Sequence, residues 1–400
     1  MSFQPVHLGS IQDGVKSLSL LSKLTIVVFT RSRPAFARRQ AEFWGGRLPT
    51  LLILDNGMEP WSSAVVAGLG SNVHYSHDEG GFYRQMRQCG ELVETEYAIL
   101  IDDDNLLVEE GLEACILELE SRAEFIAVSG QAAMLRYLRG RIILEPAYTE
   151  NFRFSNKSPK VEERISLQFN PYRHTGWYAV QRTSTFRVLL PVVSEVSEHT
   201  PCAYTPEIGL ELGLVILGAT TTIPHLTLIR SVENPPEDDA FHSRSLYFQD
   251  WWLDERYHRE TDHFVRCLKA LAPDANASFW IFMVNELNQF ASKAAKRAKP
   301  KMLVAVLKKN PITQVSWILG NLPLDRLRVW RWKFQYGLRL ARALVLHPNN
   351  RSQGFIDLPS PRKVKARPSA DLFDVTQGLV SVVNAVQRFY SPPRDTDALR

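Results

Sequence analysis

Short runs of consecutive apolar residues, many of them β-branched, recur in the first half of the chain, and polar residues follow each run. A continuous apolar run of this length that ends in polar or turn residues is typical of a buried β-strand. Four such runs are KLTIVVFTRSRP (23–34), LPTLLILDNG (48–57), EYAILIDDDN (96–105) and FIAVSG (125–130). The segment AFARRQAEFWGG between the first two predicts a helix closed by glycine. Strand, helix and strand in this order predict the βαβ unit of a parallel sheet.

The rest of the pattern predicts how the chain divides into domains. Further strands are expected at 72–77, 176–182 and 220–230, with a helix over EIGLELGLVI before the last of them. An acidic, proline-rich stretch then marks the end of a first domain, which we place at 23–230. A mostly helical domain, rich in basic and aromatic residues, is expected over 241–346. Residues 348–400 have the composition of a linker and a C-terminal tail, with one short helix near the end.

Composition is that of a soluble globular protein, because 45% of the residues are hydrophobic and 22% are charged. The four cysteines form no Cys-x-x-Cys pair, which argues against a zinc or dithiol site. No signal peptide is recognisable, and no apolar run approaches the roughly 18 residues that a membrane-spanning helix needs. We therefore expect a cytoplasmic protein without a membrane-spanning helix.

The net charge of +4 hides an asymmetry, because residues Ala291 to Val345 contain 13 Lys and Arg but one acid, Asp325. Basic residues interleaved with tryptophans suit a helix that lies in the headgroup region of an anionic membrane. The alternative is that the aromatic residues pack on the first domain while the charges face water. A nucleic-acid partner is not expected, because no DNA- or RNA-binding motif is recognisable. We therefore expect a possible anionic membrane surface as a partner, on the inner face of the membrane.

Three adjacent carboxylates, those of Asp102, Asp103 and Asp104, follow the apolar run YAILI. Ligands of open α/β sheets bind beyond the carboxyl ends of the strands. Neighbouring carboxylates repel one another, and a hard divalent cation with oxygen ligands would compensate them and bridge diphosphate oxygens. The plainer alternative is that one aspartate caps the next helix and the others face water. We favour a site for Mg²⁺ or Mn²⁺.

The order of these segments resembles that of the GT-A nucleotide-diphospho-sugar transferases, and in particular glycosyltransferase family 2. The matching segments, over about 23–230, are VVFTRSRP, ILDNG, DEGGFYRQM and AILIDDDN. The resemblance implies a Rossmann-like α/β domain that binds a nucleotide-sugar, with the helical region as an extension. It also implies that the acidic run is the DxD metal motif of that family, with Asp102 and Asp104 at its two acidic positions.

The resemblance further implies a set of donor-binding residues. Thr30 and Arg31 would lie at the nucleotide, Asp55 at the base or ribose, and Asp102 and Asp103 at the ribose or sugar. Gly80 and Gly81 would let the backbone pass close to the donor, and Arg84 would reach a phosphate. Asp104, Asp102 and a late histidine, His225, would hold the metal. Trp177 in GWYAVQR would stack on a sugar ring. The alternatives are a generic turn at Asp55-Asn56-Gly57, surface arginines, a structural His225 and a core Trp177.

A general base is expected in the segment AYTPEIGLELG. Thr205 suits an N-cap and Pro206 the first helical position, so Glu207 falls in the first turn of the helix. The resemblance implies a catalytic acid at that place, and Glu211 is the reserve candidate on the same face. The alternative is that Glu207 only complements the helix dipole. The chain has a single Glu207 where the family usually has an acidic pair, so the inverting mechanism is less firmly implied than the metal site.

Together these features predict a glycosyltransferase of the hexosyltransferase type that moves a sugar from a nucleotide-sugar donor to a glycan or lipid-linked acceptor. Two other functions share the fold class. A non-catalytic nucleotide-sugar-binding or scaffold protein would not need the intact acidic run and Glu207. A nucleotidylyltransferase would need a glycine-rich phosphate loop after the first strand, and FTRSRPAFAR contains no glycine.

Overall fold

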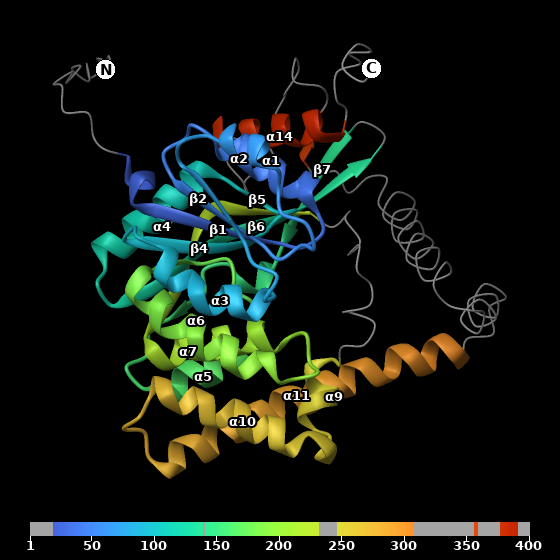
Figure 1. Ribbon diagram of the computed structural model, residues 1–400. Helices are drawn as coiled ribbons and strands as arrows, with labels where there is room; N and C mark the ends of the chain where they lie inside the picture. Colours follow the sequence, from blue (N-terminus) through green and yellow to red (C-terminus); the bar gives the residue numbers. More distant parts are fainter. Residues whose placement is uncertain (1–18, 139–140, 232–245, 308–355, 359–376, 391–400) are drawn as a thin grey trace, which may run out of the picture.

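One mixed β-sheet runs through the centre of the molecule, with helices on both faces (Figure 1). The computed structural model describes residues 19–138, 141–231, 246–307, 356–358 and 377–390. The predicted fold class, an α/β domain of Rossmann-like type with a mostly helical extension, is confirmed by the arrangement of these residues.

The first half of the sheet consists of four parallel strands in the order β3-β2-β1-β4. They are β1 (Leu24–Thr30), β2 (Thr50–Asp55), β3 (Val73–His77) and β4 (Tyr97–Asp102). All four were predicted: β1, β2 and β4 as apolar runs that end in polar residues, and β3, whose sequence is VHYSH, as a further strand at 72–77. This strand order is that of doubly wound nucleotide-binding sheets, in which ligands bind at the carboxyl ends of the strands. In the register of the sheet Thr30 lies opposite Asp55, and Phe29 opposite Asp102.

The second half of the sheet is mixed. It contains β6 (Phe125–Leu138), β7 (Arg141–Ala147), β9 (Val180–Arg182), β10 (Ala219–Ser231), β11 (Ile356–Leu358) and the two-residue strands β5 (Leu106–Leu107) and β8 (Ser155–Asn156). β9 pairs antiparallel with β4 and with β6, while β10 runs parallel to β6. The strand predicted at 125–130 continues to Leu138, and that predicted at 176–182 is confined to its last three residues. The residues before β9 form a loop that belongs to the site described below.

The two faces of the sheet are covered by different helices. On one face lie α1 (Pro34–Trp44), α4 (Glu109–Ser121) and α14 (Gln377–Tyr390); on the other lie α3 (Phe82–Leu92), α5 (Val161–Phe169), α6 (Thr183–Glu198) and α7 (Thr205–Leu217). Short helices lie at η1 (Leu20–Lys23), α2 (Ser63–Ala67) and η2 (Thr149–Asn151). The buried strand β4 serves both faces, because Ile99 and Ile101 join the first core and Ala98 and Leu100 the second.

The helical extension packs beneath α5 and α6 and shares the second core. Its described part comprises α9 (Phe248–Trp252), η3 (Glu255–Tyr257), α10 (His258–Leu268), η4 (Lys269–Leu271) and α11 (Ala277–Leu307). Trp251, Phe264 and Met283 are buried in that core. The rest of the domain predicted at 241–346 lies outside the described residues. Within the described part of the chain, no helix has the length and apolar character needed to cross a membrane.

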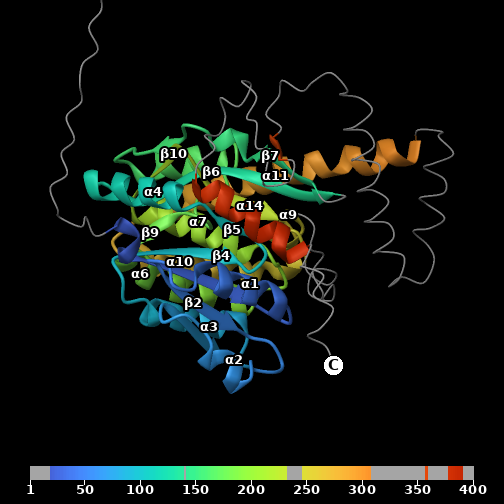
Figure 2. The same cartoon turned by 90° about the horizontal axis from the view of Figure 1, so that it is seen from above.

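The range 348–400, predicted as linker and tail, contributes to the first core. Its predicted short helix is α14, which lies between α1 and α4 (Figure 2). Leu379 and Val382 of this helix are buried in the core that covers the first face. The N–H of Gly378 donates to Glu110 Oε1 at 2.7 Å, which joins the start of α14 to α4. Strand β11 pairs antiparallel with β7 and forms the edge of the sheet at that end.

This packing predicts that α14 stabilises the α/β domain. Leu379 is 1% exposed, so Leu379→Ala should lower the free energy of unfolding of the full chain by about 2–5 kcal/mol. Arg388→Ala, at an exposed position of the same helix, is the control and should change it by less than about 0.5 kcal/mol. Denaturant unfolding measures both. Equal midpoints for Leu379→Ala and the parent would mean that α14 does not pack on the core in solution.

Candidate active site

The carboxyl ends of β1 and β4 bring a hydroxyl group and three carboxylates together. Thr30 ends β1, and Asp102 ends β4 beside it. Thr30 Oγ1 donates a hydrogen bond of 2.6 Å to Asp103 Oδ2. The structure therefore places Thr30 and the acidic run at one point on the sheet edge, where the sequence predicts the donor.

Arg33 supplies the positive charge of this group. Its guanidinium pairs with the carboxylate of Asp103 and lies 3.3 Å from Asp104 Oδ2. Ser32 has a φ of 55°, and this left-handed turn precedes Arg33, whereas Arg31 is exposed. Sequence reasoning singled out Arg31, because a loop without periodicity gives no sign of which arginine points inward. Arg33 is thus an additional candidate contact to phosphate.

Burial makes the acidic run unusual in its ionisation. Asp103 has no solvent exposure, and burial raises its pKa to about 7 although Arg33 and Thr30 oppose the shift. The pKa of Asp104 is also raised, first by burial and then by the charge of Asp102. The Arg33 guanidinium pairs with Asp103 and Asp104, and the charge of Arg39 also acts on Asp104. A further cation would relieve the repulsion that remains among the three carboxylates.

The carboxylates of the acidic run fit a cation that also binds phosphate, but His225 does not lie beside them. The described residues contain no group of three or more His, Cys, Asp or Glu arranged to hold a metal. The register of β10 shifts between Thr222 and Leu226, and His225 in that irregular stretch is exposed. The predicted ligand set of Asp102, Asp104 and His225 is therefore not assembled. Mg²⁺ commonly takes one or two carboxylates and completes its shell with phosphate and water, which Asp102 and Asp104 suit.

Asp55 is engaged within the protein. Its side chain is buried, Oδ1 accepts a hydrogen bond from the N–H of Gly57, and Oδ2 accepts one from the hydroxyl of Tyr75, each at 2.8 Å. The ring of Tyr75 stacks on Trp61 with centroids 4.6 Å apart. These contacts are those of the turn at Asp55-Asn56-Gly57, and a contact of Asp55 with nucleotide stays a prediction.

The glycine loop begins α3 as predicted. Gly81 has a φ of 87° at the N-cap of α3, a conformation that a side chain would disfavour. The N–H of Gly80 donates to Asp78 Oδ1 at 2.8 Å, and Arg84 Nε lies 2.9 Å from Asp78 Oδ2. Arg84 is largely exposed, and its contact with phosphate stays a prediction.

Glu207 and Glu211 occupy one face of α7 but differ in exposure. The helix begins at Thr205, one residue earlier than predicted, and Thr205 Oγ1 donates to the carbonyl of Cys202 instead of capping the helix. The Glu207 side chain is 30% exposed and the Glu211 side chain 1%. Glu211 accepts hydrogen bonds from the N–H groups of Thr175 and Gly176. Glu211 therefore holds the loop before β9, and Glu207 is the carboxylate that a substrate can reach.

His174 keeps Glu207 ionised. Its Nδ1 lies 3.2 Å from Glu207 Oε1, which also accepts a hydrogen bond of 2.5 Å from the hydroxyl of Tyr172. Burial alone would raise the pKa of Glu207, but the charge and hydrogen bond of His174 outweigh it and lower that pKa. Burial opposes charge on His174 too, and the two glutamates outweigh it and raise its pKa. Burial raises the pKa of Glu211 to about 7.

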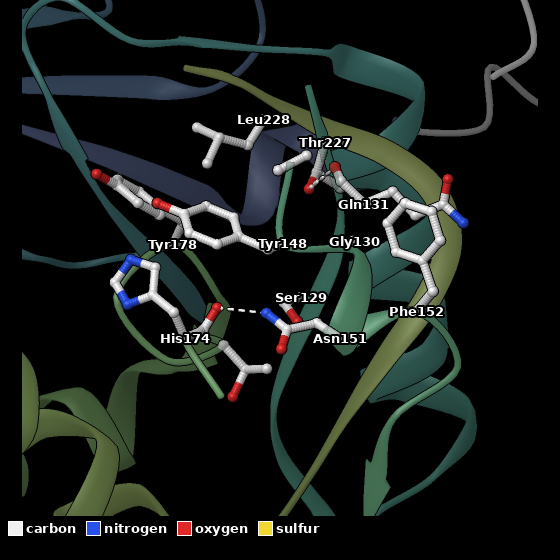
Figure 3. A pocket seen from close by; sticks show the side chains of 12 residues that line it. Ser129, Gly130, Gln131, Tyr148, Asn151, Phe152, His174, Tyr178, Thr227 and Leu228 are labelled. Carbon is white, nitrogen blue, oxygen red and sulfur yellow. Dashed lines mark hydrogen bonds between the residues drawn. The ribbon is translucent and has the colours of Figure 1, made fainter. Parts of the chain in front are cut away.

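The loop before β9 links Glu207 to the acidic run. The Tyr178 hydroxyl donates to Asp102 Oδ2 at 2.6 Å, and the rings of His174 and Tyr178 lie 5.5 Å apart. A third ring, that of Tyr148, lies 4.9 Å from His174 (Figure 3). Sequence reasoning missed all three, because this loop has no periodic pattern. Trp177, which it chose, packs half-buried against the second core, while its neighbour Tyr178 lines the pocket.

The predicted membrane-binding segment cannot be placed beside this site. Most of its basic and aromatic residues, from Lys308 onward, lie outside the described residues. Lys293 and Lys296 on α11 are described and exposed, and Lys293 Nζ donates to Asn170 Oδ1 at 2.9 Å.

Comparison with known proteins gives a distant likeness in structure. No protein-family model matches the chain, and no curated protein matches its sequence. A crystal structure of S. aureus TarS 1–349 in complex with UDP-GlcNAc is similar over 67% of this chain and 80% of that one, with a TM-score of 0.40 and 11% identity. A second structure of the same fragment covers 67% and 81%, with a TM-score of 0.39 and 11% identity. So distant a likeness does not assign an activity, and the assignment rests on the geometry of this chain.

The charged pair of His174 and Glu207 predicts a pH-dependent effect of His174→Gln on stability. The lowered pKa of Glu207 stabilises the fold above its ordinary value of 4.5, and this is lost as the pH falls through the folded pKa. The raised pKa of His174 stabilises the fold below its ordinary value of 6.5, and this is lost as the pH rises through the folded pKa. The loss of unfolding free energy should therefore be largest between pH 4.5 and 6.5.

Denaturant unfolding of the parent and His174→Gln at pH 5.5 and at pH 8.5, on the order of two pH units above the ordinary histidine pKa, measures this difference. Equal losses at the two pH values would show that the native pair is not charged.

Proposed function

We propose that this chain is a glycosyltransferase that binds a nucleoside diphosphate sugar at the carboxyl edge of its parallel strands and transfers the sugar to an acceptor hydroxyl. One observation carries the proposal. A single short loop joins the acidic run, whose carboxylates suit the cation of a diphosphate, to Glu207, an ionised glutamate that a substrate can reach. The links are the hydrogen bond from Tyr178 to Asp102 and the ion pair of His174 with Glu207.

Glu207 is the proposed general base. It takes the proton of the acceptor hydroxyl as that oxygen attacks the anomeric carbon, and the bond from the anomeric carbon to the diphosphate breaks. Attack on the side opposite the leaving group inverts the anomeric centre. A base must be ionised before it reacts, and Glu207 meets this condition, while its lowered pKa makes it a weaker proton acceptor than an ordinary glutamate. Glu211 has the supporting role, because it is buried and committed to Thr175 and Gly176.

Asp102 and Asp104 would hold Mg²⁺ or Mn²⁺ in the proposed complex. When bound, the cation would neutralise the leaving diphosphate. Arg33 lies against the same carboxylates and would add a fixed positive charge next to the phosphates. Thr30 and Asp103 hold this loop in place, while Arg31, Gly80, Gly81 and Arg84 remain proposed contacts of the donor.

The acceptor is proposed to be a glycan or a lipid-linked sugar. A lipid-linked acceptor would agree with a basic C-terminal region on the inner face of an anionic membrane. A scaffold protein would have no need of an ionised glutamate held by a charged histidine, and a nucleotidylyltransferase would have no need of a base at that position.

The donor site predicts metal-dependent binding of nucleoside diphosphates that Asp104→Ala abolishes. With Mn²⁺, the preferred nucleoside diphosphate at a hundredfold excess over its dissociation constant should stabilise the parent by about 2.7 kcal/mol. Asp104→Ala should fold and show no metal-dependent gain, because it removes a ligand and little core volume. Asp254→Ala, which removes an aspartate of the helical extension, should behave as the parent. Unchanged metal-dependent binding by Asp104→Ala would refute the metal assignment.

The base assignment predicts that Glu207→Gln lowers turnover by at least about a hundredfold while donor binding is kept. The amide keeps the shape of the side chain and loses the proton acceptor. Glu198→Gln, the same change at the exposed end of α6, is the control and should leave turnover near that of the parent. Steady-state transfer rates and donor titrations separate the two effects. Turnover of Glu207→Gln near the parental rate would remove Glu207 from the chemistry.

A further inference from the structure

A pocket between β6 and β10 lies where the loop before β9 joins the two carboxylate centres (Figure 3). Its lining comes from Ser129–Ala132 of β6, Tyr148, Asn151 and Phe152 after β7, the loop at 174–178, and Thr227 and Leu228 of β10. Tyr178 in its wall bonds to Asp102, and His174 in its wall pairs with Glu207. A ligand in the pocket would therefore lie between the proposed diphosphate site and the proposed base.

Two buried oxygens of the pocket lining have no hydrogen-bond partner among the residues that the structure describes. They are Oε1 of Gln131 and Oδ1 of Asn151, whose residues are 9% and 5% exposed. Asn151 Nδ2 donates to the carbonyl of His174 at 2.7 Å, which fixes the amide so that Oδ1 is the free acceptor. An unpaired buried acceptor is costly, so a ligand that brings donors gains free energy at these atoms.

Several other polar groups of the lining are already engaged. The hydroxyls of Ser129 and Thr222 lie 2.9 Å apart, and Thr227 Oγ1 donates to the carbonyl of Gln131 at 3.3 Å. The capacity open to a ligand therefore includes the two acceptors, which select hydroxyl or amide N–H groups.

The rest of the lining is aromatic. Figure 3 shows the rings of Tyr148 and Tyr178 beside His174, with Phe152 on the far side of the pocket. Aromatic faces provide apolar platforms for the C–H faces of a sugar ring. Of the positive charges nearby, His174 faces Glu207 and Glu211, and Arg33 faces the acidic run. Arg230 lies against the same wall, where its guanidinium donates to the Tyr148 hydroxyl and lies 5.7 Å from the centre of that ring. Aromatic faces with free acceptors suit a ring that carries hydroxyl groups.

We infer that the transferred sugar ring of the donor lies at the mouth of this small pocket and places one of its substituents in it, and that Asn151 and Gln131 select the sugar by accepting hydrogen bonds from its hydroxyl or amide N–H groups. This inference rests on the proposed function and deepens it, because it assigns donor specificity to two residues outside the acidic run. The ring lies between its diphosphate, at Asp102 and Asp104, and the acceptor hydroxyl, at Glu207. That order is the one an in-line displacement needs.

The test compares nucleoside diphosphates with their sugar conjugates on the full chain. Dissociation constants for UDP, GDP and a panel of UDP- and GDP-linked hexoses and N-acetylhexosamines are measured by calorimetry with Mn²⁺. Gln131→Met keeps the length of the side chain and removes its acceptor, and Asn151→Ala removes the second one. Asn156→Ala is the matched control, because Asn156 is also buried with an unpaired Oδ1 and donates its amide to one backbone carbonyl, that of Arg164, but does not line the pocket.

Each pocket variant should bind the bare nucleoside diphosphate within about twofold of the parent. Its preference for the best sugar over the next should fall by about two- to tenfold, the scale of one lost hydrogen bond. The control should keep the parental preference. If the parent discriminates among sugars and both pocket variants keep that preference, the inference is overturned while the proposed function stands. If the parent binds no nucleoside diphosphate or conjugate, the proposed function fails and the inference fails with it.

Discussion

The burial of one carboxylate, that of Asp103, constrains how the first half of the molecule is assembled. This side chain is fully buried, and a buried charge is costly unless an opposite charge and hydrogen bonds compensate it. Thr30 supplies the hydrogen bond and Arg33 the charge. These residues come from β4, β1 and the loop before α1, so the three elements must keep their relative positions for the compensation to hold. The acidic run is thereby fixed in place by the fold itself.

The C-terminal helix reaches the same loop through α1. Arg39 Nη2 of α1 donates to the carbonyl of Asp104 at 2.7 Å, and Gln40 Nε2 donates to that of Asp103 at 2.9 Å. The Arg39 guanidinium in turn lies 4.8 Å from the ring of Phe389 on α14, close enough for a cation–π contact. Because α14 touches the residues that hold the acidic loop, the range 377–390 belongs with the α/β domain in structure although it follows the helical extension in sequence.

The sequence predicted what depends on regular patterns and missed what depends on loops. Buried runs with polar ends specified β1, β2 and β4, and parallel strands then bring Thr30 and Asp102 to one edge without further information. The same reasoning could not choose Arg33 over Arg31, because the choice depends on the left-handed turn at Ser32. His225 was placed at the metal by the resemblance alone, and the structure leaves it exposed in the stretch of β10 where the register shifts. The loop before β9 has no periodic pattern, so nothing in its sequence indicated that it joins the acidic run to Glu207 and Glu211.

The pair of glutamates on α7 shows how burial assigns roles that sequence spacing leaves equal. Helical geometry puts Glu207 and Glu211 on one face, four residues apart, and His174 Nδ1 lies 3.2 Å from the first and 3.8 Å from the second. One imidazole thus faces two carboxylates of unequal exposure, and such groups titrate as a unit. Protonation of Glu207 would remove the charge that does most to raise the pKa of His174. A proton taken up at Glu207 would therefore lower the pKa of His174. Loss of the His174 proton would then leave both side chains neutral, and transfer of the Glu207 proton to His174 would restore the ion pair.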